Sequence, residues 1–340
     1  MVSRIVAGLG LLMAPAVASA QTGLLVVAHG AGQEWNDRVR ETVAQVRWDR
    51  GPVSVAFLMG AEMTSAGWTA GVDSLVARGA KEIVVVPLMV SSHGSHYRQV
   101  RYYAGELAEL PADLAAHAHH GPDGAPRVPM RVTAALDDAP ELAAALGARW
   151  RELDARDRGR ALLLVAHGPN DSAEAVTWVR NITSVSEGLR AATGKTVHVG
   201  LLRDDAPPEV RARAIAAMRD SVLAMARADG DSVVAMPVMI SAGAITQTRI
   251  PKDLAELPIR YYSTPLTPLP QIARWIERSA AAALAAPRRV SADRRLEDLD
   301  RAGGRIEARA NADGQRPLLV DMADRKAEGD GNAERFEVRR

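Results

Sequence analysis

The chain has 340 residues, which is long for a single hydrophobic core and predicts two domains of ordinary size. Its 42 Lys and Arg residues nearly balance its 41 Asp and Glu residues, so no strong electrostatic field favours binding to nucleic acid. The sequence contains no cysteine, which excludes disulfides, thiolate catalysis and iron–sulfur clusters. Any metal ligand must therefore be His, Asp, Glu or Met.

Residues 1–20 have the order of a secretory signal peptide. Arg4 precedes an apolar stretch, and Ala18-Ser19-Ala20 supplies the small residues that a signal peptidase requires. The apolar part is too short to span a bilayer. We therefore expect a periplasmic or secreted mature protein with no stable membrane insertion after cleavage.

Short apolar runs alternate with longer helix-compatible segments from residue 23 onward. Continuous apolar runs of this length indicate parallel strands that helices cover on both faces. In the first half, the expected strands are 24–30, 53–59 and 82–92, and the expected helices are 34–50 and 64–80.

The second half repeats this order. The runs "LLVVAHG" and "LLLVAHG" open the two halves, and Pro87 and Pro237 occupy the same place in the third strand of each. The expected strands are 161–168, 196–202 and 232–243, and the expected helical segments are 171–194, 207–230 and 249–257. We predict an α/β fold of two duplicated, doubly wound parallel-sheet domains, residues 23–150 and 151–285, that face each other across a cleft.

Two segments outside the repeated elements receive no chemical role. Residues 116–131 are rich in Gly, Pro and His and are typical of a linker, and the histidines at 117, 119 and 120 have no scaffold to place them. Residues 286–340 combine dense mixed charge with few large apolar residues, which indicates a flexible tail.

Four histidines lie where expected strands end. His29 and His167 each end the first strand of a half and precede a glycine, whereas His93 and His96 follow the third strand of the first half. Ligands of doubly wound sheets bind outside the carboxyl ends of the strands, and glycine lets the chain turn sharply there. A lone histidine at a strand end commonly serves a turn, but the repeated His-Gly favours a site. Neutral imidazoles suit cobalt, nickel, iron or zinc, and His29, His93 and His96 are the expected ligands.

A carboxylate also follows a strand in each half. Glu62 comes after the second strand, and Asp204 or Asp205 holds its place in the second half. Such a group can complete a metal site or accept a proton, or it can simply be solvated. No nucleotide is expected, because "GAGQ" after His29 lacks the Lys and Ser/Thr of a phosphate-binding loop.

The motifs "LLVVAHG", "LLLVAHG", "VSVAFLMGAEM" and "EIVVVPLMVSSHGSH" resemble the sirohydrochlorin cobaltochelatase family of the CbiX type, over roughly residues 23–270. The family is similar in fold to the class II chelatases, which insert a divalent metal into a tetrapyrrole without ATP. The resemblance matches His29 to the first family histidine and Gly94-Ser95-His96 to the second, with His93 as a competitor. In the second half it places Ile245 where the second histidine would be, so it implies a site built mainly from the first half.

The resemblance therefore implies a lyase that inserts cobalt, with iron or nickel as alternatives, into sirohydrochlorin or a related tetrapyrrole. Two pyrrole protons must leave while the metal loses water, and this requires a neutral base beside a metal ligand. His29, His96 and Glu62 are the expected catalytic residues. Arg98, Arg101 and His167 are expected to contact the macrocycle, the arginines through its carboxylates.

The predicted export is the main departure from the family, because cobalamin and sirohaem are made in the cytoplasm. It favours an alternative function, a non-catalytic periplasmic metal- or haem-binding protein derived from a chelatase.

Overall fold

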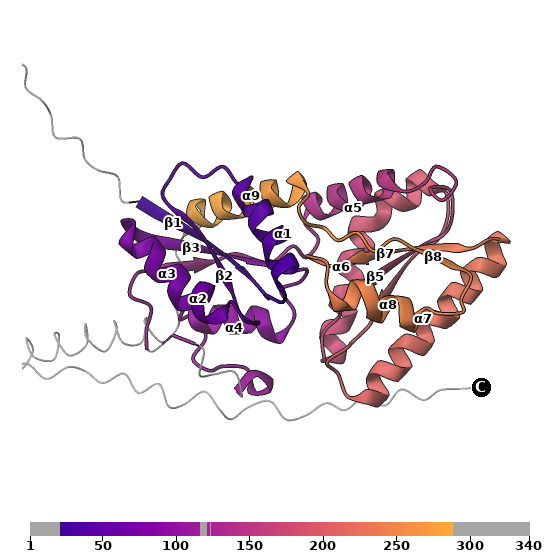
Figure 1. The fold of residues 1–340 in the computed structure, drawn as a ribbon, viewed down its shortest axis with the longest axis horizontal. Helices are drawn as coiled ribbons and strands as arrows, with labels where there is room; N and C mark the ends of the chain where they lie inside the picture. The colour runs from indigo at the N-terminus through magenta and orange to yellow at the C-terminus, as the bar shows by residue number, and fades with distance from the viewer. Residues whose placement is uncertain (1–20, 116–120, 123, 288–340) are drawn as a thin grey trace, which may run out of the picture. The chain divides into compact units, whose positions relative to one another are not determined.

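The computed structural model describes residues 21–115, 121–122 and 124–287 (Figure 1). These residues fall within one compact unit. The predicted signal peptide, the linker histidines at 117, 119 and 120, and residues 288–340 of the charged tail lie outside the described residues.

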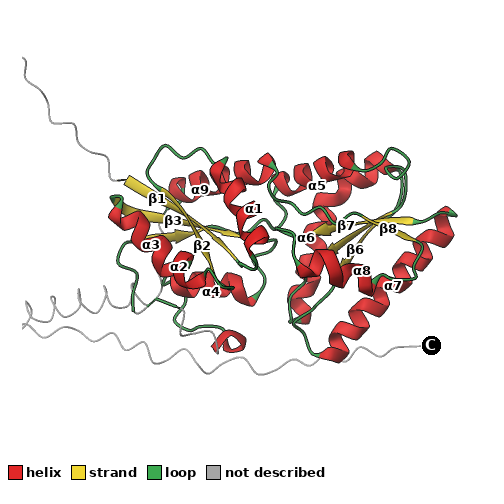
Figure 2. Cartoon of the chain, in the orientation of Figure 1, coloured by secondary structure: helices red, strands yellow, loops and turns green. Residues whose placement is uncertain are grey.

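Each half of the chain folds into a parallel sheet of four strands (Figure 2). The first sheet contains β1 (Gln21–Ala28), β2 (Val53–Phe57), β3 (Ala80–Leu88) and β4 (Met130–Val132). The second contains β5 (Leu162–Ala166), β6 (Val197–Leu201), β7 (Val233–Val238) and β8 (Ile259–Tyr261). Their orders, β2-β1-β3-β4 and β6-β5-β7-β8, are the same arrangement, which confirms the predicted duplicated α/β fold.

Helices connect these strands and cover the sheets. They are α1 (Gln33–Ala44), α2 (Met63–Ala66), α3 (Trp68–Ala77), α4 (Ser95–Tyr103), α5 (Pro140–Glu152), α6 (Ser172–Thr193), α7 (Pro208–Asp229), the π-helix η2 (Ile245–Arg249), α8 (Ile250–Asp253) and α9 (Pro270–Ala285). The two long helices predicted in the second half are confirmed as α6 and α7. Asp171 caps the start of α6, and the left-handed glycines Gly194 and Gly230 end α6 and α7.

Two expectations about local structure are wrong. The single helix expected over 64–80 is interrupted at Gly67, whose extended backbone separates α2 from α3. A side chain at this position would overlap the Met63 carbonyl oxygen. The predicted linker 116–131 also runs into β4, which pairs with β3 at the sheet edge.

Apolar residues are buried on both faces of each sheet, which explains why the strands read as continuous apolar runs. Along β1, Leu24 and Val26 face one core while Leu25 and Val27 face another. The core that contains Leu24 extends without a break to β5 of the second sheet. The two halves therefore share one hydrophobic core and each has a second core of its own.

The last helix of each half packs on the other half (Figure 1). Helix α9, at the end of the second half, lies against β3 and β4 of the first sheet, while α5 lies against α6. Trp275 and Ile276 of α9 are almost fully buried in the shared core, and Arg278 of α9 pairs with Glu141 of α5. This reciprocal exchange joins the halves through buried apolar area as well as through the chain.

Among the described residues, no helix combines the length and apolar character needed to cross a bilayer.

Candidate functional site

The strand order of the first sheet brings the ends of β1 and β3 together. Ala28 at the end of β1 pairs with Leu88 at the end of β3, so the residues that follow both strands emerge at one edge. The neighbouring strands β2 and β4 lie on opposite sides of this pair, so the chain segments that leave β1 and β3 run in opposite directions. The crevice between such segments is where doubly wound sheets bind ligands. His29 and His96 meet there, with ring centroids 4.6 Å apart and planes at 86°.

Gly30 fixes the orientation of the His29 ring. Its φ of 85° turns the chain, and its carbonyl oxygen accepts a hydrogen bond of 2.7 Å from His29 Nδ1. A side chain on Gly30 would overlap the Met59 carbonyl oxygen and lie 2.9 Å from Phe57 Cβ, so only glycine fits. Because the carbonyl can only accept, the proton of the neutral ring sits on Nδ1 and the lone pair on Nε2.

The second half repeats this device. His167 Nδ1 donates to the Gly168 carbonyl oxygen at 2.9 Å, and Gly168 has a φ of 77°. The repeated His-Gly of the sequence is thus a local motif that uses a left-handed glycine to hold the preceding imidazole.

The His29 imidazole is neutral at physiological pH. Its side chain is accessible to solvent, and partial desolvation by the protein atoms packed around the ring is the main reason that its pKa falls to about 4. The nearby His96 lowers the pKa further, His167 has the same effect, and Asp205 raises it. Protons therefore do not compete for the His29 lone pair at pH 7.

His96 reaches His29 from the first turn of α4. The helix begins at Ser95, after the cap residue Gly94, so His93 precedes it and shares no helical face with His96. The His96 Nδ1 atom donates to Gln99 Oε1 at 2.9 Å, which again puts the lone pair on Nε2. The ring that contacts His29 is therefore that of His96.

His93 makes different contacts. Its Nδ1 atom lies 3.5 Å from Ser91 Oγ, and its backbone carbonyl accepts a hydrogen bond from Trp178 Nε1 of α6. The main chain of His93 thus links the first half to α6 of the second.

His167 and Asp205 of the second half lie close enough to influence the pKa of His29. Asp205 Oδ2 is 3.5 Å from His167 Nε2, within ion-pair range. Even so, no three His, Asp or Glu side chains in the described ranges are grouped closely enough to hold a metal ion. The compact element of the site is the pair His29 and His96.

Glu62 is engaged away from this pair. Both of its oxygens are used: the side chain forms an ion pair with Arg40 and accepts a hydrogen bond of 2.8 Å from the buried amide of Asn36. These interactions hold its pKa below the ordinary value, with Arg40 as the largest cause. A carboxylate stabilised in its charged form is a weak proton acceptor, and these contacts link Glu62 to α1.

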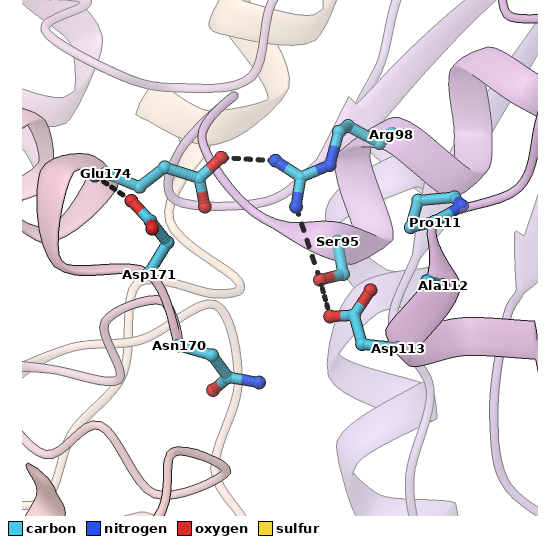
Figure 3. A pocket seen from close by; sticks show the side chains of 8 residues that line it. All are labelled: Ser95, Arg98, Pro111, Ala112, Asp113, Asn170, Asp171 and Glu174. Carbon is cyan, nitrogen blue, oxygen red and sulfur yellow. Dashed lines mark hydrogen bonds and ion pairs between the residues drawn. The ribbon is translucent and has the colours of Figure 1, made fainter.

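Arg98 and Arg101, the two expected macrocycle contacts, both have partners within the protein. Arg98 pairs with Glu174 of α6, and Arg101 Nε donates to Glu106 at 3.0 Å. Arg98 lines a pocket of about 370 Å³ between the halves (Figure 3). The other lining residues are Ser95, Pro111, Ala112, Asp113, Asn170, Asp171 and Glu174.

This pocket is lined by three carboxylates and one guanidinium. Figure 3 shows Arg98 bridging Glu174 and Ser95, and Ser95 donating in turn to Asp113. Neither His29 nor His96 lines it.

The counterpart of His96 in the second half is Thr246, not Ile245 as the sequence motif implied. Ala244 caps η2 as Gly94 caps α4, so the second residue of each helix is Thr246 and His96 respectively. Gln99 was not predicted as a site residue. Its place three residues after His96 would have indicated a contact between the two side chains if this segment had been predicted as a helix.

Residues 23–153 match the CbiX family model, a span that corresponds to the first half and contains both His29 and His96. Comparison with curated protein sequences finds no match to this chain.

Solved structures of similar fold extend over both halves. SirB from Bacillus subtilis with Fe3+ has a TM-score of 0.52 at 16% identity, covering 77% of this chain and 95% of that chain. The sirohydrochlorin chelatase SirB from Bacillus subtilis subspecies spizizenii, in complex with cobalt, has a TM-score of 0.53 at 14% identity, covering 78% and 97%. DR2241 from Deinococcus radiodurans, a multi-domain protein with structural similarity to chelatases, has a TM-score of 0.50 at 17% identity, covering 80% and 56%. At these identities the likeness concerns the fold.

Proposed function

We propose that the chain is a metal chelatase of the CbiX type, on the ground that residues 23–153 match the CbiX family model. Its substrates are a divalent cation, cobalt before iron or nickel, and sirohydrochlorin or a related tetrapyrrole. The contact between His29 and His96 is the observation that carries the proposal.

The geometry of this contact suits a shared metal ion. Two imidazole nitrogens on one ion lie at most about 4 Å apart, since each metal–nitrogen bond is about 2.0–2.1 Å. Ring centroids 4.6 Å apart allow that separation with small side-chain movements. The low pKa of His29 keeps its lone pair available to the metal at neutral pH.

Within residues 21–115 and 124–287 no three His, Asp or Glu side chains are grouped to hold a metal, and a pair of imidazole ligands favours transfer over storage. Structural metal sites use four ligands and catalytic sites commonly three. Two imidazoles leave the remaining coordination positions to water and to the pyrrole nitrogens of the incoming macrocycle. As the metal passes to the macrocycle, the His96 lone pair becomes available to accept one pyrrole proton, and the second proton leaves to solvent.

Arg98 is the proposed contact for a macrocycle carboxylate, in exchange for its present partner Glu174. His167 lies on the opposite half and is proposed to contact the substrate from there. Export of the mature protein also remains part of the proposal, because it rests on the signal-like residues 1–20 of the sequence.

The test is metallation of sirohydrochlorin by the purified chain with Co2+, followed by absorbance. We expect His29→Ala and His96→Ala each to lower the rate at least a hundredfold. His93→Ala should keep most of the activity, because the hydrogen bond from α6 is to the main chain of His93. A wild-type chain that binds Co2+ tightly and makes no product would instead support the metal-carrier function. Equal rates for the wild type and both active-site variants would refute the proposed site.

A further inference from the structure

A buried amide supports the His96 imidazole from behind. Gln99 is 1% exposed, and its side chain makes two hydrogen bonds of 2.9 Å: Oε1 accepts from His96 Nδ1, and Nε2 donates to the hydroxyl of Tyr103. Tyr103 is itself 2% exposed and packs against Trp68 in the core that belongs to the first half alone. A buried glutamine is costly unless both ends of its amide are satisfied, and here both are.

This arrangement selects one tautomer of His96. An imidazole that binds a metal or accepts a proton through Nε2 must carry its own proton on Nδ1. Without an acceptor at Nδ1 the neutral ring can take either tautomer, and one of them has no lone pair on Nε2. In the structure the nitrogen end of the Gln99 amide donates to the Tyr103 hydroxyl, and the oxygen end faces His96.

The duplicated half provides an internal comparison. When α4 and η2 are aligned at their first residues, the positions of His96, Gln99 and Tyr103 hold Thr246, Arg249 and Asp253 in the second half. Arg249 pairs with Asp204, and Asp253 accepts a hydrogen bond from Arg211. The half that lacks the histidine therefore also lacks the buried amide and the hydroxyl that orients it, although the surrounding fold is the same.

We propose that Gln99, held by Tyr103, is a positioning residue that keeps the Nε2 lone pair of His96 available at the contact with His29. The proposal deepens the function proposed above and rests on it. Partners that hold the second nitrogen of a ligating histidine commonly change metal affinity by ten- to hundredfold. His29 needs no such side chain, because the Gly30 carbonyl performs the same task.

The first experiment measures the tautomer of His96 by ¹⁵N NMR in the chain without metal. In the wild type we expect the proton on Nδ1. Gln99→Leu should populate the other tautomer, and Gln99→Glu, which restores an acceptor, should return the proton to Nδ1. Unchanged ring-nitrogen signals in a folded Gln99→Leu chain would overturn the proposal, and this readout does not depend on any chelatase activity.

The second experiment titrates the same chains with Co2+ alone. We expect Gln99→Leu to bind ten- to hundredfold more weakly, Tyr103→Phe to lose less, and Gln99→Glu to recover most of the affinity. Gln247→Leu, an exposed glutamine of η2 in the second half, is the matched control and should bind as the wild type does. Thermal melting identifies any variant that fails to fold, in which case Tyr103→Phe carries the test. A tautomer shift in chains that neither bind nor insert Co2+ would refute the proposed function and leave the positioning role in place.

Discussion

Replacing Gly30 with alanine tests the claim that a left-handed glycine at a crowded strand end holds His29. The backbone at Gly30 has a φ of 85°, which costs a residue with a side chain about 1–2 kcal/mol. The new methyl group would also overlap the Met59 carbonyl oxygen, a backbone atom that cannot rotate away, and overpacking of this kind costs about 1–3 kcal/mol. We therefore expect Gly30→Ala to lower the free energy of unfolding by about 2–5 kcal/mol.

Two other glycines calibrate this magnitude. Gly168 has a similar φ of 77°, but its methyl group would meet only the side chains of Leu201 and Arg203, so Gly168→Ala should cost about 1–2 kcal/mol. Gly188 lies exposed within α6 with nothing within 4 Å of the added carbon, and Gly188→Ala should stabilise by about 0.5–1 kcal/mol.

Chemical denaturation of the metal-free chains, followed by tryptophan fluorescence, measures all three variants. The expected order of stability is Gly188→Ala above wild type, then Gly168→Ala, then Gly30→Ala. The reasoning fails if Gly30→Ala is as stable as the wild type, because the turn would then not require glycine. A folded Gly30→Ala chain should also bind Co2+ more weakly, since the acceptor for His29 Nδ1 moves.

Two further predictions concern charge. Glu62→Gln should lose the ion pair with Arg40 and about 0.5–1 kcal/mol of stability while metallating sirohydrochlorin within twofold of the wild-type rate, and a tenfold slower single turnover would restore Glu62 as proton acceptor. The metal-free chain should lose stability as the pH falls from about 7 to about 4, because the unfolded His29 takes up a proton near pH 6.5 and the folded one only near pH 4. Denaturation at several pH values should show a smaller loss for His29→Asn over that window, and equal losses for both chains would contradict the lowered pKa.

Local sequence features account for much of the fold. The apolar runs and the helical segments are local patterns, and their repetition predicted two similar parallel-sheet domains, as the structure has them. The His-Gly pair at the end of β1 likewise carries its own geometry, because the hydrogen bond of His29 is to the very next residue. Such features depend on neighbours in the chain, so one sequence suffices to read them.

The exchange of α5 and α9 could not be read in this way. An amphipathic pattern shows that a helix has an apolar face, but it does not say which of two similar sheets receives that face. Both helices follow a short edge strand in their own half, and each packs on the other half in the shared core.

The site followed the same division. The sequence by itself determined that His29 and His96 follow strands, because each comes just after an apolar run, whereas the pairing of β1 with β3 that makes those strand ends neighbours is tertiary. Only the tertiary structure decided that the ring in contact with His29 is that of His96. The same holds for the ion pair of Arg40 with Glu62 and for the hydrogen bond of Gln99 to the His96 imidazole. The physical reason is that each of these depends on where a helix begins or on which distant side chain meets a polar group, and packing sets both.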